Sequence, residues 1–64
     1  MQHFNHRFGD QSYACTYKLQ FDRLIVATVF GTETVPLNSS DDPLRIARVV
    51  AHDILSKASR DKLI

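Results

Sequence analysis

Hydrophobic and polar residues alternate along Ser12–Phe21, and this period of two is typical of a β-strand with one buried face. The next segment, Leu24–Phe30, is hydrophobic on both faces and rich in β-branched residues, as in a central strand covered on both sides. Glu33–Leu37 is predicted as a third strand, and Pro36 places it at the sheet edge because proline has no N–H to donate. The pattern therefore predicts a three-stranded antiparallel meander.

Turns at Asp22–Arg23 and Gly31–Thr32 would connect these strands. The first turn would pair Leu19 with Val26, and the second would pair Val26 with Leu37. The hydrophobic residues of all three strands then share one face, whereas a slip of one residue would scatter them. The predicted core combines this face with one side of a helix: Tyr17, Leu19, Phe21, Leu24, Val26, Phe30, Val35, Leu37, Ile46, Val50 and Ile54.

A helix is predicted after the strands, because Asp42 can cap its first turn and Pro43 suits the first helical position. It should run from Pro43 to about Ser59. Its apolar arc spans roughly 240°, which is broader than the stripe of a helix that lies on a single surface. Three strands cannot cover such an arc, so either the N-terminal arm or another chain must cover the remainder.

The predicted fold class is α+β: a three-stranded antiparallel β-meander followed by one C-terminal α-helix packed on one sheet face. The chain is one domain over residues 1–64, with a polar N-terminal arm at 1–10, the meander at 11–37 and the helix at 42–60. Phe4 and Phe8 are the only large apolar side chains of the arm. The pattern leaves open whether the arm is an extra edge strand or an irregular segment.

The composition restricts the class of protein. Hydrophobic residues make up 44% and charged residues 23% of the 64 positions, which favours a folded domain over a disordered chain. Eight Lys and Arg against seven Asp and Glu leave a net charge of +1, so the balance does not mark an obvious nucleic-acid or membrane binder. A single cysteine excludes an intrachain disulfide. No apolar run reaches the ~20 residues of a membrane span, and the N-terminus lacks a signal-peptide pattern, so we expect a cytoplasmic protein.

Few residues are candidates for chemistry. The chain has no Gly-rich phosphate loop and no nucleophile triad or carboxylate pair, so we expect no enzyme activity, no catalytic residues and no cofactor. His3 and His6 could supply two metal ligands, but two histidines in a polar arm are more often surface residues, and we predict no metal site. Cys15, in mid-strand on the predicted core face, is interpreted as a small buried apolar residue rather than a reactive thiol.

Two surfaces are candidates for binding. One is the basic face of the helix, with Arg45, Arg48 and His52. The other is the outer sheet face, with Ile25, Ala27 and Val29. We expect the sheet face to mediate self-association as a homodimer, because an exposed apolar patch usually marks an interface. The helix face is then expected to contact a foreign protein, since arginine can form paired hydrogen bonds to carboxylates.

The order of elements over Tyr13–Ala58, three strands and then an alanine-containing helix, resembles the C-terminal part of a double-stranded-RNA-binding domain. The resemblance implies a meander with the helix on one face. The chain departs from that family in two respects: the family's first helix is missing, and Asp41–Asp42 replaces the basic cluster at the start of the last helix. Because the acidic pair would repel phosphates, the family's function is not carried over.

We therefore expect a small non-enzymatic protein-binding module, of the accessory or phage type, that inhibits a larger host complex by occupying one of its surfaces. The alternative is a small nucleic-acid-binding module that uses the basic helix face. A mobility-shift assay at low salt would separate the two, because phosphate-driven binding weakens steeply as salt rises.

Overall fold

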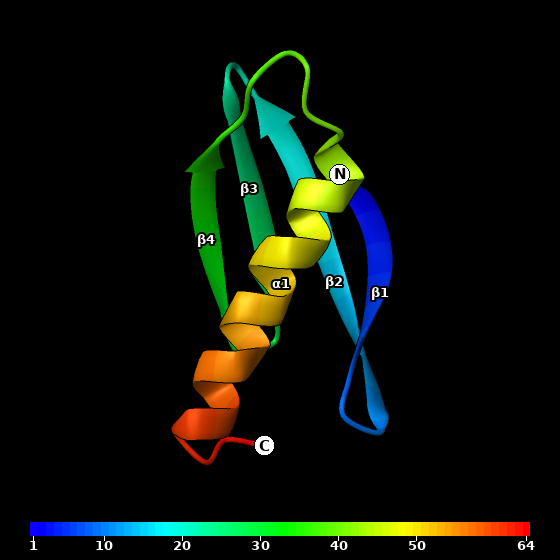
Figure 1. Ribbon diagram of the computed structural model, residues 1–64, viewed down its shortest axis with the longest axis vertical. Helices are drawn as coiled ribbons and strands as arrows, with labels where there is room; N and C mark the ends of the chain where they lie inside the picture. Colours follow the sequence, from blue (N-terminus) through cyan, green and yellow to red (C-terminus); the bar gives the residue numbers. More distant parts are fainter.

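Four antiparallel strands and one C-terminal helix make up the computed structural model, which describes residues 1–64 (Figure 1). The elements are β1 (Gln2–Phe8), β2 (Gln11–Gln20), β3 (Arg23–Thr28), β4 (Gly31–Pro36) and α1 (Pro43–Arg60). The strands lie in the order β1-β2-β3-β4, so each pairs with its neighbour in the chain. The predicted α+β class, antiparallel sheet and C-terminal helix are confirmed, but the sheet has four strands rather than three.

The additional strand is β1, formed by the segment that the sequence pattern left undecided between an edge strand and an irregular arm. Phe4 is only 8% exposed and pairs with Cys15, which places it in the core beneath α1. Gly9, with φ of 65°, helps to close the tight turn into β2. Only Phe4 and Phe8 are large apolar residues on the covered side of β1. The alternation of this segment is therefore too weak to identify a strand.

The β2–β3 turn occupies Phe21–Asp22 rather than the predicted Asp22–Arg23. As a result Leu19 pairs with Leu24 instead of Val26, a shift of two positions. An even shift keeps every side chain on its predicted face, because side chains in a strand alternate with a period of two.

The β3–β4 turn is displaced in the same way. It occupies Val29–Phe30 rather than Gly31–Thr32, and Val26 pairs with Glu33 instead of Leu37, a shift of four positions. The covered face again keeps its predicted residues, although their partners differ. The glycine at the predicted turn is instead the first residue of β4, with φ of 156°.

The start of α1 matches the sequence prediction. The Asp42 side chain accepts a hydrogen bond from the Leu44 N–H at 3.1 Å, and Pro43 opens the helix. At the other end, Lys62 adopts a left-handed φ of 61°. The N–H of Leu63 there donates to the carbonyl oxygen of Ala58 at 2.9 Å, so the chain turns back against the helix it has just left.

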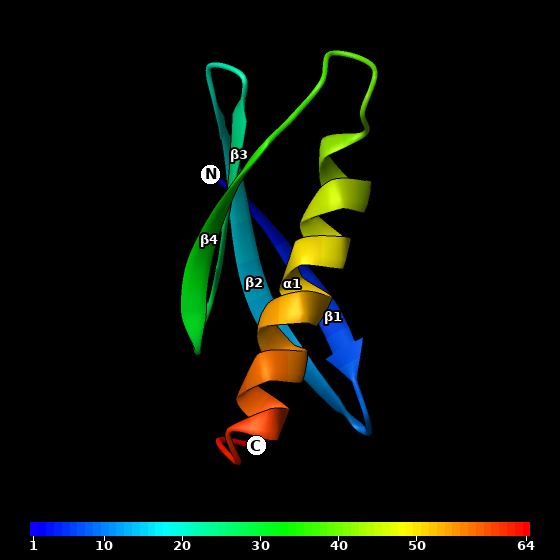
Figure 2. The same ribbon diagram turned by 60° about the vertical axis from the view of Figure 1, so that its left-hand side comes forward.

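The core lies between α1 and one face of the sheet (Figure 2). Of the predicted core residues, Leu24, Val26, Val50 and Ile54 are buried. Partly buried residues packed against the core include the predicted Tyr17, Phe30, Val35, Leu37 and Ile46. Cys15 is buried as well, as predicted, although it was not in the predicted core set. The buried residues that were not predicted are Phe4, Ala47, Ala51, Leu55 and Ala58.

The prediction of burial is wrong for two residues. Leu19 is 54% exposed and Phe21 is 97% exposed. Both lie near the tip of the β2–β3 hairpin, which extends past the end of β1, and Phe21 belongs to the turn itself. The sheet of the same chain covers most of the wide apolar arc of α1, because β1 makes it one strand wider than predicted. Val49, 62% exposed on the helix flank, is the main part of the arc left outside.

Candidate functional site

The face of the sheet opposite α1 is not covered by any element of the chain (Figure 2). The strand register assigns its residues, because directly paired residues share a face and alternate residues change face. We call this surface the open face, and it consists of His3, Asn5, Arg7, Ser12, Ala14, Thr16, Lys18, Gln20, Arg23, Ile25, Ala27, Thr32, Thr34 and Pro36.

The charges of the open face all have one sign. Arg7, Lys18 and Arg23 are exposed there, and no Asp or Glu lies among them. The two nearest acidic residues by sequence, Asp10 and Asp22, belong to the hairpin turns at the ends of the sheet. The other carboxylates lie on the covered side of β4, in the loop before α1, or on and just after α1. A chain with a net charge of +1 therefore concentrates positive charge on one surface.

These three cations are free of intramolecular partners. Both salt bridges of the protein are formed by Lys57, with Glu33 at 3.0 Å and with Asp53 at 3.3 Å. The open-face arginines and lysine thus keep their full hydrogen-bonding capacity for an external ligand. Their neighbours on the face are mostly hydroxyl and amide side chains, which can donate or accept hydrogen bonds.

The basic helix face predicted from the sequence is turned partly toward β1. Arg45 is exposed and forms no salt bridge. Arg48 lies over the Phe4 ring, with its guanidinium carbon 6.0 Å from the ring centroid, and Nη1 donates a long 3.5 Å hydrogen bond to the Asn5 carbonyl. His52 contacts β1 as well. Only Arg45 of the three predicted partner-binding residues is free of contacts with the sheet.

His52 links α1 to β1 through a pair of histidines. Its Nδ1 is 3.2 Å from Nε2 of His6, and its ring centroid is 5.3 Å from that of Phe8. Burial, together with the neighbouring His52 and Arg48, holds the pKa of His6 below its usual value of 6.5. Protonation of His6 is therefore disfavoured while its ring packs against α1.

The remaining candidate residues for chemistry are separated by the fold. His3 lies on the open face and His6 on the covered face of β1, so they cannot ligate one ion together. No group of three or more His, Cys, Asp and Glu side chains converges anywhere in the structure. Cys15 is buried at 3% exposure, as predicted, and burial raises the pKa of its thiol.

The residues expected to mediate self-association lie in two settings. Ile25 and Ala27 are half-buried in the open face, in the same rows as Lys18 and Thr16. Val29 is not part of a strand but of the β3–β4 turn, where it is 73% exposed. The apolar part of the open face is therefore small, and the cations flank it.

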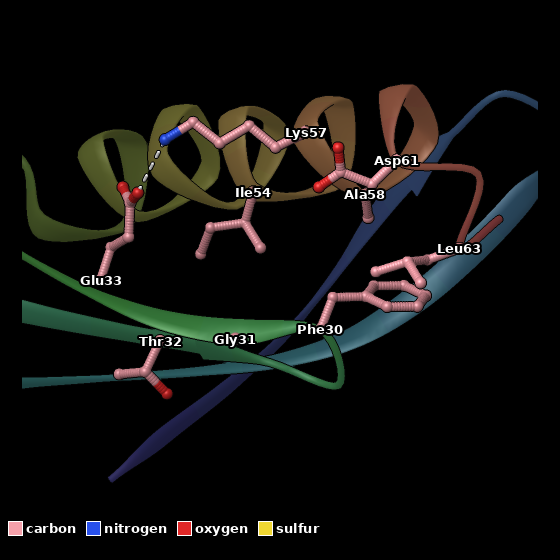
Figure 3. A pocket seen from close by; sticks show the side chains of 9 residues that line it. All are labelled: Phe30, Gly31, Thr32, Glu33, Ile54, Lys57, Ala58, Asp61 and Leu63. Atoms are coloured by element: carbon pink, nitrogen blue, oxygen red, sulfur yellow. Dashed lines mark hydrogen bonds and ion pairs between the residues drawn. The ribbon is translucent and has the colours of Figure 1, made fainter.

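A hollow of about 180 Å³ lies between the end of α1 and the β3–β4 turn (Figure 3). Phe30 and Leu63 lie side by side at one end of it, and the Lys57–Glu33 ion pair spans the other. Hydrogen bonds from Lys57 to Glu33 and Asp53 raise the pKa of this lysine. Because its lysine is already neutralised by two carboxylates, we place the candidate site on the open face rather than here.

Sequence reasoning identified this surface only in part. The alternation of β2 places Lys18 on the outer face, but Arg23 was assigned to a turn and Arg7 to an undecided arm. All three cations could have been found from the alternation of faces along each strand, which places Arg7, Lys18 and Arg23 on the same side of the sheet. That step requires β1 to be recognised as a strand and the β2–β3 turn to be placed correctly.

The helix of the structure is not long and apolar enough to cross a bilayer. No protein-family model matches the chain, and neither the curated proteins nor the solved structures searched include a significant match. The open face is therefore the feature of the protein that bears most directly on its function.

Proposed function

We propose that the protein is a small non-enzymatic module that binds nucleic acid through the open face of its sheet. The observation that supports this function is the set of three unpaired cations, Arg7, Lys18 and Arg23, on an exposed face without a carboxylate. Phosphate backbones present a regular row of negative charges, and their neutralisation by Lys and Arg provides most of the affinity of non-specific binding.

The spacing of the cations suits an extended ligand. Arg7 pairs with Ser12, and Lys18 lies six positions further along β2, which at the strand rise is about 20 Å. Between the two ends lie the polar side chains of Asn5 and Thr16, and Gln20 follows just beyond Lys18; these groups can bond to sugars, phosphates or base edges. A polyanion lying along β2 would meet positive charge at both ends and hydrogen-bonding groups between them.

The same charges argue against face-to-face pairing of two copies. Such a dimer would bring Arg7, Lys18 and Arg23 of each copy together with no carboxylate between them, and like charges at an interface are unfavourable. Self-association through Ile25 and Ala27 remains a prediction that competes with nucleic acid for this surface. Sedimentation equilibrium with and without oligonucleotide would show whether the ligand displaces a second copy.

Fluorescence anisotropy with labelled single-stranded and duplex oligonucleotides tests the proposal. The triple variant Arg7→Gln/Lys18→Gln/Arg23→Gln removes the open-face charge. A matched variant, Arg45→Gln/Arg60→Gln/Lys62→Gln, removes the same charge from α1 and the turn that follows it. The parent should bind more weakly as salt rises, with a log–log slope of about −2 for single strands if three phosphates are neutralised.

The open-face triple variant should lose most of the binding and most of the salt dependence, whereas the helix variant should retain both. Greater loss in the helix variant would move the site from the open face to α1 and the turn that follows it. A folded parent that binds no oligonucleotide at low salt would overturn the proposal and leave the protein-binding module as the working hypothesis.

A further inference from the structure

Phe21 is the most exposed large hydrophobic residue of the protein, at 97% exposure. It is the first residue of the two-residue β2–β3 turn, and the Gln20–Arg23 pair closes the ladder directly behind it. The carbonyl oxygen of Asp22, the second turn residue, accepts a 2.8 Å hydrogen bond from the Leu37 N–H. The ring is therefore presented to solvent from a turn that is fixed on both sides.

Folding gains little from a phenylalanine at this position. Its backbone has a left-handed φ of 58°, a conformation that is unfavourable for bulky residues and is usually occupied by Gly, Asn or Asp in hairpin turns. Its ring is not among the core residues or those packed against them. A residue that is unfavourable for the turn and absent from the core is explained most simply by a contact outside the chain.

The tip of the hairpin also carries most of the charge of the open face. Arg23 follows the turn directly, and Lys18 lies one row further along the same face. Asp22 adds one carboxylate at the turn itself. An exposed aromatic ring and two cations on the same hairpin tip are a combination that can bind a base and its flanking phosphates, because every base offers a π-face to an aromatic side chain.

We propose that Phe21 stacks on an unpaired base of a single-stranded nucleic acid while Lys18 and Arg23 contact the adjacent phosphates. This inference rests on the proposed function and adds the ligand class, since duplex bases already stack on one another and offer no free face. The Phe21 ring then distinguishes single strands from duplexes, whereas the cations of the open face respond to charge alone.

A fluorescent substitution tests the contact directly. The chain has no tryptophan, so Phe21→Trp introduces a single reporter at the tip. Its emission should be quenched by a single-stranded oligonucleotide and unchanged by inorganic polyphosphate, which carries the charge but no bases. A single strand that binds this variant without changing its emission would overturn the inference.

Affinities measured on Phe21→Gly give the second readout. Glycine suits the left-handed turn, so the variant should fold, and it should bind single strands about tenfold more weakly than the parent. Its affinity for polyphosphate should be unchanged. Leu19→Ala, which trims another exposed apolar side chain of the same hairpin, is the matched control and should bind single strands as the parent does.

The outcomes separate the two proposals. If the parent binds oligonucleotides and Phe21→Gly binds single strands equally well, the stacking contact is wrong while the open face remains the site. If the parent prefers duplex, and Phe21→Gly removes that preference, the ring acts as a wedge between paired bases and the single-strand inference fails. A parent without any affinity for oligonucleotides overturns both proposals, and the exposed ring is then assigned to a protein contact.

Discussion

Lys62 occupies a left-handed backbone position that glycine fills in most helix C-termini. Its N–H donates to the Ser59 carbonyl at 3.1 Å, and the N–H of Leu63 donates to Ala58 at 2.9 Å. These two bonds satisfy carbonyl groups that the end of α1 would otherwise expose. The following Leu63 lies beside Phe30 (Figure 3), so the left-handed turn at Lys62 directs an apolar side chain back onto the domain.

We predict that Lys62→Gly stabilises the protein by about 0.5–1 kcal/mol, because glycine adopts a positive φ without a Cβ clash. Thermal denaturation followed by circular dichroism would show a rise of a few degrees for a domain of this size. Lys62→Ala is the matched control: it removes the same charge, keeps the Cβ and should not raise the melting temperature. A glycine variant that melts below the alanine variant would contradict this account.

The helix illustrates how much of an element can be predicted from the sequence. Asp42 and Pro43 fixed its start, and its apolar arc identified Val50 and Ile54 as core residues. The small residues Ala47 and Ala51 were not predicted in the core, although both are fully buried. Alanine at a helix position is compatible with either face, so only the approach of the sheet decides its burial.

The packing of α1 is tested by two adjacent valines. Val50 is 7% exposed in the core, and Val49 next to it is 62% exposed. Val50→Ala should destabilise the protein by about 1–3 kcal/mol, because it removes buried methyl groups and leaves a cavity. Val49→Ala should change the stability by less than about 0.5 kcal/mol. Urea denaturation of both variants decides the matter, and equal losses would mean that the helix faces the sheet differently.

The strands show why register is harder to predict than faces. The two turns lie at Phe21–Asp22 and Val29–Phe30, and neither has the glycine or asparagine that marks a tight hairpin turn. The second turn was therefore predicted at Gly31–Thr32, where the only glycine of this region lies. Because both errors moved the pairing by an even number of residues, the residues of β3 and β4 nevertheless lie on the faces predicted for them.

At the scale of the molecule, the His6–His52 contact joins the first element, β1, to the last, α1. Burial first, then His52 and Arg48, lower the pKa of His6 in the folded state. The unfolded chain keeps the ordinary pKa of about 6.5 and therefore binds the proton more readily as the pH falls. Stability is consequently greatest above that pH and decreases on acidification until it passes the lower folded-state pKa.

We predict that the urea midpoint falls between pH 7.5 and pH 5 by more in the parent than in His6→Gln. The variant lacks the shifted group, so it should lose the part of the pH dependence that comes from this contact. Arg48 faces the same pair from α1, and no carboxylate forms a salt bridge with either histidine. Identical pH profiles for the two proteins would show that the pair contributes nothing to the linkage.

The candidate site was predictable only in fragments. The outer sheet face was expected to mediate self-association. Its positive charge was not predicted, because Arg7 was assigned to an arm and Arg23 to a turn. The basic helix face was expected to be free, yet Arg48 and His52 contact β1. The strand β1 accounts for most of these differences, because it supplies Arg7 to the open face and a partner to the helix, and the displaced β2–β3 turn accounts for Arg23.

The sequential order of the strands has a consequence for how quickly the domain forms. Each hairpin joins neighbouring segments through a short turn, and isolated hairpins form within about 1–10 μs. The contact between His6 and His52 instead joins residues 46 positions apart. The entropy of closing such a loop must be overcome before the helix is held in place. We therefore expect the sheet to assemble from local steps, and the docking of α1 onto β1 to be slower than the formation of the hairpins.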